Sequence, residues 1–332
     1  MFLKDIEPTV SSSSLPDMVP NFTGRHDELQ QIVALVSSED TPMVTIWGTP
    51  GFGKTSVGIA VMHKLHSHGF PVWFLSLRGL RSKSDLLSRL FGLVSKYATS
   101  QKSAPQCLNT EEKLIWNLSK ILDPLVLFLD NADDLLESGD SSLKEDIIGL
   151  FERILTENKK ITLIVTTRQS LEFIDLSFQG HKSVRRMPMD ESSANALVRK
   201  LAPRFIPHDC ARMARLCGYV PLAIGLMCSL LYEDGVQPSC SLTEFTEPFK
   251  QSILDILDNP DFPARKRLKF LYESSFGRLS QEEKEAFVSL SVLPACFTTA
   301  MASVVLNVAG IQCKKLLQRL RRKSLQIGRA HV

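Results

Sequence analysis

The stretch GTPGFGKT at residues 48–55 decides the fold class of this chain of 332 residues. It has the spacing G-x-x-x-x-G-K-T, in which glycines let successive backbone N–H groups turn toward a phosphate. The run before it, residues 43–47, is apolar and typical of a buried strand, and residues 56–66 after it have the pattern of a helix. A helix that begins there directs the positive end of its dipole at the same point. The stretch therefore predicts a loop that binds the phosphates of a nucleotide.

The side chains of this loop have separate expected roles. We expect Lys54 to bridge the β- and γ-phosphates, and Thr55 to bind Mg²⁺ through its hydroxyl. The loop residues that we expect to contact the nucleotide are Gly48, Pro50, Gly51, Phe52, Gly53, Lys54, Thr55 and Ser56. The predicted cofactors are ADP or ATP, together with Mg²⁺.

A second predicted strand ends in a carboxylate. Residues 125–129 are apolar throughout and precede Asp130, which we expect at the carboxyl end of a strand that is buried on both faces. Asp130 is the second predicted Mg²⁺ ligand, through water. Asn131 follows where many P-loop ATPases carry the acid that polarises the attacking water, so we expect slow hydrolysis. Asp133 and Asp134 are the alternative bases, although both lie further along the turn and a solvated strand-to-helix turn explains them better.

A third apolar strand, residues 161–165, leads into Thr166, Thr167 and Arg168. A guanidinium at the end of a core strand can bind phosphate oxygens bidentately, and it keeps its charge at all relevant pH values. We therefore expect Arg168 to sense the γ-phosphate. The predicted catalytic set is Lys54, Asp130 and Arg168.

Two further motifs give the chain a family resemblance. Residues 21–25, NFTGR, precede Asp27, Glu28 and Leu29, and residues 217–223 read CGYVPLA. With the phosphate loop, the strand that ends in Asp130 and the TTR at residues 166–168, these motifs resemble the NB-ARC class of STAND ATPases in order and spacing. That class includes plant disease-resistance receptors and the apoptosome scaffold. The resemblance covers about residues 20 to 325.

The resemblance carries several implications. It implies an α/β fold, a P-loop NTPase with a five-stranded parallel sheet in the order 5-1-4-3-2, then a helical domain and a partial winged-helix domain. It implies that Phe22 and Arg25 flank the adenine and that Pro221 closes over the nucleoside. The implied function is an ADP/ATP switch that controls self-association in innate-immune or cell-death-like signalling, with unknown effector and sensor regions outside this chain.

The expected organisation follows from composition along the chain. We expect a flexible linker at residues 1–20, a nucleotide-binding domain at 21–182, a small helical domain at 183–260 and a partial winged helix at 261–326. Thr110 is predicted to cap a helix, and residues 242–257 are predicted to be helical. The box histidine and hairpin of the family are missing, and residues 327–332 match a reading frame of a common sequencing-library adapter. We therefore expect a truncated protein with a non-native tail.

Composition narrows the function classes. Seven cysteines without a C-x-x-C pair indicate reduced thiols, so we expect a cytoplasmic protein. The longest apolar stretch, residues 220–231, is too short to span a bilayer, so we expect no membrane segment. His63, His66 and His68 form a weak metal pattern, which the dipole at a helix C-terminus explains without a metal. The net charge of only +3 argues against a nucleic-acid partner, despite a basic run at residues 314–323. The alternative function is an AAA+ ATPase whose winged helix binds DNA.

Overall fold

The computed structural model describes residues 15–97, 104–136, 141–171, 179–233, 273, 276–277, 279–293, 296–322 and 329–331. These residues divide into two compact units. Unit 1 comprises the described part of Met1–Pro20, with Arg25–Trp47 and Lys54–Arg185. Unit 2 comprises Asn21–Gly24, Gly48–Gly53 and the described residues from Arg186 onward. The phosphate loop up to Gly53 is thus grouped with the C-terminal segments.

Unit 1 is built on a parallel sheet of five strands. The strands are β1 (Met43–Trp47), β2 (Val72–Ser76), β3 (Leu125–Asp130), β4 (Ile161–Thr167) and β5 (Lys182–Arg185), in the order β2-β3-β4-β1-β5. This is the predicted order 5-1-4-3-2 read from the opposite edge, so the prediction of the fold class is confirmed. Because all strands are parallel, their carboxyl ends lie along one edge of the sheet.

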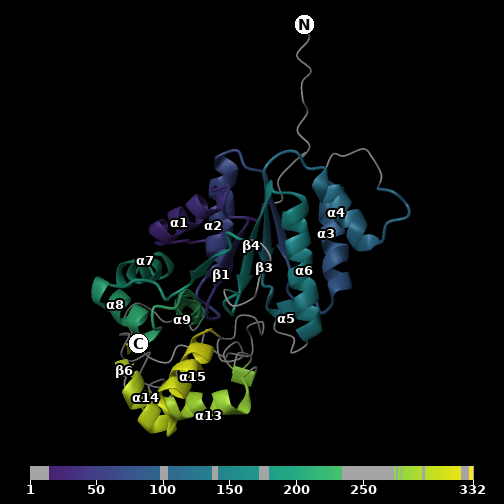
Figure 1. The fold of residues 1–332 in the computed structure, drawn as a ribbon. Helices are drawn as coiled ribbons and strands as arrows, with labels where there is room; N and C mark the ends of the chain where they lie inside the picture. Colours follow the sequence, from purple (N-terminus) through teal and green to yellow (C-terminus); the bar gives the residue numbers. More distant parts are fainter. Residues whose placement is uncertain are drawn as a thin grey trace. The chain divides into compact units, whose positions relative to one another are not determined.

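Helices cover both faces of this sheet (Figure 1). They are α1 (His26–Val36), α2 (Lys54–Ser67), α3 (Lys83–Tyr97), α4 (Thr110–Ser119), α5 (Asp133–Leu136) and α6 (Ser141–Glu157). Helices α1 and α2 lie on one face, and α3, α4 and α6 on the other. Burial on both faces explains why β1 and β3 are apolar almost throughout. Helix α2 approaches the sheet closely, because a Cβ on Gly58 would lie 2.2 Å from the ring of Phe128.

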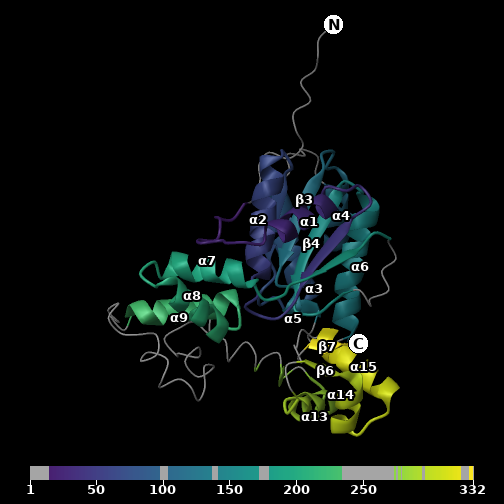
Figure 2. The same cartoon turned by 90° about the vertical axis from the view of Figure 1, so that its left-hand side faces the viewer.

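The described residues of unit 2 form two separate apolar cores. Helices α7 (Glu191–Leu201), α8 (Pro207–Leu216) and α9 (Pro221–Glu233) lie side by side (Figure 2) and share the first core. Helices α13 (Gln281–Leu290), α14 (Thr299–Leu306) and α15 (Gly310–Arg322) share the second. Next to this second core, strand β6 (Cys296–Thr298) pairs in parallel with β7 (Arg329–His331). The partial winged helix expected at residues 261–326 stays a prediction.

The start of α4 corrects one expectation. The N-cap is Asn109, not Thr110, and it forms a reciprocal pair of hydrogen bonds with Glu112. The Glu112 N–H donates to Asn109 Oδ1 at 2.9 Å, and the Asn109 N–H donates to Glu112 Oε2 at 2.8 Å. Either residue type can cap a helix, and the acid three residues after Asn109 decides between them. The helix predicted at residues 242–257 lies outside the described residues.

Within the described part of the chain, no single helix is both long and apolar enough to cross a membrane. Two sharply bent pairs, α8 with Pro221–Ser229 and α14 with Gly310–Leu320, meet the criterion by length and composition alone.

Candidate nucleotide-binding site

The phosphate loop between β1 and α2 depends on its glycines. Gly48, Gly51 and Gly53 have φ angles of 149°, 84° and 81°, a region of backbone conformation that side chains with a Cβ rarely adopt. Gly48 is also constrained by space, because a Cβ there would lie 2.8 Å from the carbonyl oxygen of Arg186. The loop therefore has the curled backbone that its sequence predicts.

The same loop is fixed to the first helical core of unit 2. The backbone N–H of Leu222 donates to the carbonyl oxygen of Gly51 at 3.3 Å. Pro221 is the first residue of α9, so the N–H of Leu222 has no acceptor inside its own helix. Phe52 is only 4% exposed and belongs to the core formed by α7, α8 and α9. The loop thus satisfies an N-terminal donor of α9 with a backbone carbonyl and packs a ring into its core.

The residues predicted to flank the adenine fall in different units. In unit 2, the carbonyl of Phe22 accepts from Lys200 Nζ at 3.4 Å, and a Cβ on Gly24 would lie 2.1 Å from Ser193 Oγ. In unit 1, the backbone of Arg25 is in the left-handed region at φ 63°, and its Nη1 lies 3.3 Å from Oε2 of Glu28. The adenine-binding roles of Phe22 and Arg25, and the role of Pro221, stay predictions.

Asp130 lies at the centre of a hydroxyl network at the carboxyl end of β3. Its Oδ1 accepts from Thr55 Oγ1 and from Thr166 Oγ1, each at 2.7 Å. Asp130 is 4% exposed, so these donors stabilise a carboxylate that is almost removed from water. The structure brings together the two predicted Mg²⁺ ligands, Thr55 and Asp130, and their oxygen donors suit that ion. Sequence reasoning missed Thr166, whose only signal was a hydroxyl at the end of an apolar strand.

The residues after Asp130 are held by Thr166 of β4 and by residues that follow β4 and β2. Asn131 has a left-handed backbone at φ 63°, and its N–H donates to Thr166 Oγ1 at 2.7 Å. Asp134 Oδ2 accepts from the Gly79 N–H at 2.9 Å. Asp133 pairs with Arg168: Oδ1 accepts from the Arg168 backbone N–H at 2.5 Å, and Oδ2 lies 3.4 Å from Nε. Both alternative bases therefore already hold neighbouring groups.

Arg168 follows β4 at the same edge of the sheet as Asp130. Its side chain is 14% exposed, whereas that of Asp133 is 2% exposed. The predicted phosphate sensor is thus partly buried against a carboxylate. The sequence suggested no such pair, because the partners lie 35 residues apart.

A tryptophan at the end of β1 was also missed. Trp47 and Arg185 are register partners on β1 and β5, and the guanidinium carbon lies 5.1 Å from the centre of the Trp47 ring. This cation–π contact packs the strand end that leads into the phosphate loop.

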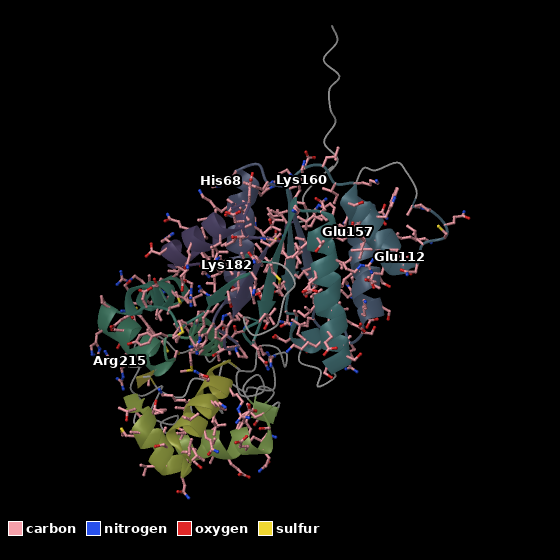
Figure 3. All side chains as sticks on the ribbon, viewed as in Figure 1. His68, Glu112, Glu157, Lys160, Lys182 and Arg215 are labelled. Carbon is pink, nitrogen blue, oxygen red and sulfur yellow. The ribbon has the colours of Figure 1, made fainter. Side chains whose placement is uncertain are left out.

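His63, one of the three histidines near the end of α2, has a hydrogen-bond partner in the structure. His63 Nε2 lies 2.8 Å from the carbonyl oxygen of Pro16. Figure 3 shows His68 and Lys160 near the edge of the sheet where β4 begins, opposite the edge that carries Asp130. Among the described residues, no group of three or more His, Cys, Asp and Glu could hold a metal ion.

Comparison with known proteins gives a family match for part of the chain. Residues 21–152 match the family described as AAA ATPase domain. A curated relative, an uncharacterised WD repeat-containing protein of Nostoc sp., is 24% identical over 98% of this chain and 26% of its own length. The chain thus spans about a quarter of the length of that relative.

Solved structures support the fold. The Walker-type ATPase of Pyrococcus abyssi has a TM-score of 0.64 at 13% identity, covering 94% of this chain and 93% of that one. Orc1 of Aeropyrum pernix in complex with DNA has a TM-score of 0.50 at 17% identity, covering 93% of this chain and 86% of that one. A STAND protein with a tetratricopeptide repeat sensor from Pyrococcus horikoshii has a TM-score of 0.45 at 16% identity, covering 97% of this chain and 41% of that one. The sheet order and the similarity to the P. abyssi and A. pernix structures support a P-loop NTPase fold, within which residues 21–152 are similar to the AAA ATPase domain family.

Proposed function

We propose that this protein is a nucleotide-controlled assembly switch of the NB-ARC type within the STAND ATPases. ADP holds it in a closed form, and exchange for ATP allows self-association. The output is a scaffold for an effector of unknown identity, in innate-immune or cell-death-like signalling in the cytoplasm.

The observation that carries the proposal is the attachment of the phosphate loop to α9. A switch must convert a change at the phosphates into movement elsewhere. Gly51 accepts a hydrogen bond from Leu222, and Phe52 lies in the core of α7, α8 and α9. A ligand that changes the conformation of this loop must therefore also change the free energy of the helical core. This link supports a switch better than it supports a freely turning-over ATPase.

The predicted ligands fit the residues that would hold them. Lys54 and Thr55 open α2, and Asp130 lies within hydrogen-bonding distance of Thr55. Thr55 would bind Mg²⁺ directly and Asp130 through water, and the ion would neutralise charge on the phosphates. Lys54 would add a mobile positive charge beside them.

Slow hydrolysis is part of the proposal. Asn131 cannot accept a proton from water, and Asp133 and Asp134 each accept a backbone hydrogen bond. A site without an available general base retains ATP for longer, which a switch requires.

The identity of the co-purifying nucleotide tests the proposal. The full chain is purified without added nucleotide, denatured and analysed by anion-exchange chromatography. We expect close to one ADP per chain in the wild type and almost none in Lys54→Ala. Lys64→Ala, at the other end of the same helix, is the matched control and should retain ADP. A wild-type preparation free of nucleotide, which also fails to bind added ADP, would contradict the proposal.

A second candidate function is an AAA+ ATPase that binds DNA. Two observations favour it: Lys314 and Lys315 are exposed on α15, and the fold is similar to that of an Orc1 in complex with DNA. Against it, Arg319 of the same helix pairs with Glu282 at 3.0 Å. DNA binding that weakens steeply with salt, and is lost in Lys314→Glu/Lys315→Glu, would favour this candidate over the switch.

A further inference from the structure

We infer that Asp133 sets the preference between ATP and ADP, because it occupies the guanidinium that the γ-phosphate must recruit. The inference rests on the proposed function, in which Arg168 senses the γ-phosphate. Asp133 is here a positioning residue that acts through Arg168.

The geometry of the pair is that of an internal ligand. The two carboxylate oxygens divide their contacts, one to the Arg168 backbone N–H and the other to the side-chain Nε. Both side chains are largely removed from water: that of Asp133 is 2% exposed and that of Arg168 is 14% exposed. A guanidinium in such a place favours an anionic partner, and both carboxylate and phosphate can accept two hydrogen bonds from it.

Arg168 is placed where this competition can matter. It follows β4 directly, and β4 lies between β1 and β3 in the sheet. Thr166, two residues earlier, donates to Asp130, which in turn accepts from Thr55 of α2. Arg168 thus shares one edge of unit 1 with the residues expected to hold Mg²⁺.

The competition affects only one nucleotide. ADP has no γ-phosphate, so its binding leaves the pair with Asp133 in place. The γ-phosphate of ATP must compete with Asp133 for this guanidinium, and ATP loses binding free energy in that competition. Asp133 therefore weakens ATP binding selectively and favours the ADP form.

Asp133→Asn tests this directly. The amide oxygen can still accept from the Arg168 backbone N–H, whereas the negative charge beside Nε is lost. The measurement is the dissociation constant for ADP and for a non-hydrolysable ATP analogue, with Mg²⁺, by calorimetry. We expect the ratio of the two constants to shift about tenfold in favour of the ATP analogue, the size of one charge-assisted hydrogen bond. ADP affinity itself should stay within about twofold of wild type.

Asp134→Asn is the matched control. It makes the same chemical change one residue along α5, on a carboxylate that accepts from the Gly79 N–H. We expect its ratio to equal that of wild type. If Asp133→Asn does not fold, Asp133→Glu is used in its place. The glutamate keeps the charge but displaces both carboxylate oxygens, so Asp133→Glu should shift the ratio in the same direction by a smaller factor than Asp133→Asn.

Arg168→Ala separates the two ways in which the account can fail. We expect this variant to shift the ratio toward ADP. If it does so while Asp133→Asn and Asp133→Glu leave the ratio unchanged, the inference about Asp133 is wrong and Arg168 remains the sensor. If Arg168→Ala leaves the ratio unchanged, Arg168 is not the sensor, and the inference is overturned with that part of the proposed function.

Discussion

The hydroxyl of Thr166 donates a hydrogen bond of 2.7 Å to Oδ1 of Asp130, across the neighbouring strands β4 and β3. The same hydroxyl accepts from the backbone N–H of Asn131 at 2.7 Å. One buried side chain therefore contacts both the carboxylate expected to hold Mg²⁺ and Asn131, which is expected to stand in the place of the general base.

Thr166→Val should weaken Mg²⁺ binding. The valine is close to threonine in shape but cannot donate to Asp130, so the carboxylate loses one of its two hydroxyl donors. We expect the affinity for Mn²⁺ in the presence of ADP to fall about tenfold, measured by electron paramagnetic resonance. Thr166→Ser keeps the hydroxyl and should retain most of the affinity. Equal affinities in the wild type and the valine variant would show that Thr166 does not position Asp130.

Lys54→Ala should abolish measurable binding of both ADP and ATP, because it removes the mobile cation of the phosphate loop. The change in the melting temperature without nucleotide should be small, since Lys54 is the first residue of α2 and not part of a core. Calorimetry with ADP measures the effect. A variant that binds ADP within about threefold of wild type would refute the assignment of this lysine.

Asn131→Asp should accelerate hydrolysis. The left-handed backbone at this position tolerates aspartate, so the substitution adds a carboxylate beside Asp130 without strain. We expect wild-type turnover below about one per minute, far below that of an average enzyme, and a clear increase in the variant. Asn131→Gly, which accepts the same backbone without a carboxylate, should show no increase. Wild-type phosphate release above about one per second would contradict slow hydrolysis.

Phe52→Ala should destabilise the helical core that contains α7, α8 and α9. Removing a buried phenylalanine costs about 3 kcal/mol or more, and Phe52 is 4% exposed in that core. Hydrogen exchange should therefore rise in α7 and α9 more than in β3 and β4. Phe52→Leu fills most of the space and should cause a smaller loss. Uniform changes across both units would mean that the ring does not link the loop to these helices.

Asp190 gives the stability of α7 a defined dependence on pH. Hydrogen bonds from the side chains of Ser192 and Ser193, and from the Ser193 N–H, lower the pKa of Asp190 to about 2 from its ordinary 3.8. The pKa of Asp190 is lower in the folded state than in the unfolded state. The stabilisation of the folded state by these hydrogen bonds is therefore complete above the pKa of the unfolded state, and it is lost as the pH falls toward about 2. Asp190→Ala, which removes the N-cap, should cost about 1 kcal/mol near neutral pH and less on acidification. Urea midpoints of both proteins at several pH values measure this, and a difference that grows toward low pH would contradict it.

The sheet could be predicted because its signals are local. Buried parallel strands must be apolar on both faces, so β1, β3 and β4 are visible as short runs that are apolar for most of their length. The phosphate loop has a fixed spacing between a strand and a helix, which places Lys54 and Thr55 without further information. Asp130 followed from the end of its strand.

The contacts that connect these parts could not be predicted. The pair of Asp133 with Arg168 joins segments far apart in the chain, and it depends on strand register that no local pattern encodes. The hydrogen bond from Leu222 to Gly51 is formed by backbone groups, so side-chain identity gives no sign of it. Asn109 was overlooked as the cap of α4 because Asn and Thr are both good caps, and only the pair with Glu112 separates them.

The mass of the assembled protein tests the central claim most directly. The full chain is loaded with Mg²⁺ and either ADP or a non-hydrolysable ATP analogue, and its mass is measured by light scattering across a range of concentrations. We expect a monomer with ADP, a larger assembly with the ATP analogue, and a monomer in both conditions for Lys54→Ala. A wild-type protein that binds both nucleotides and has the same mass with each would contradict the account of a nucleotide-controlled assembly switch.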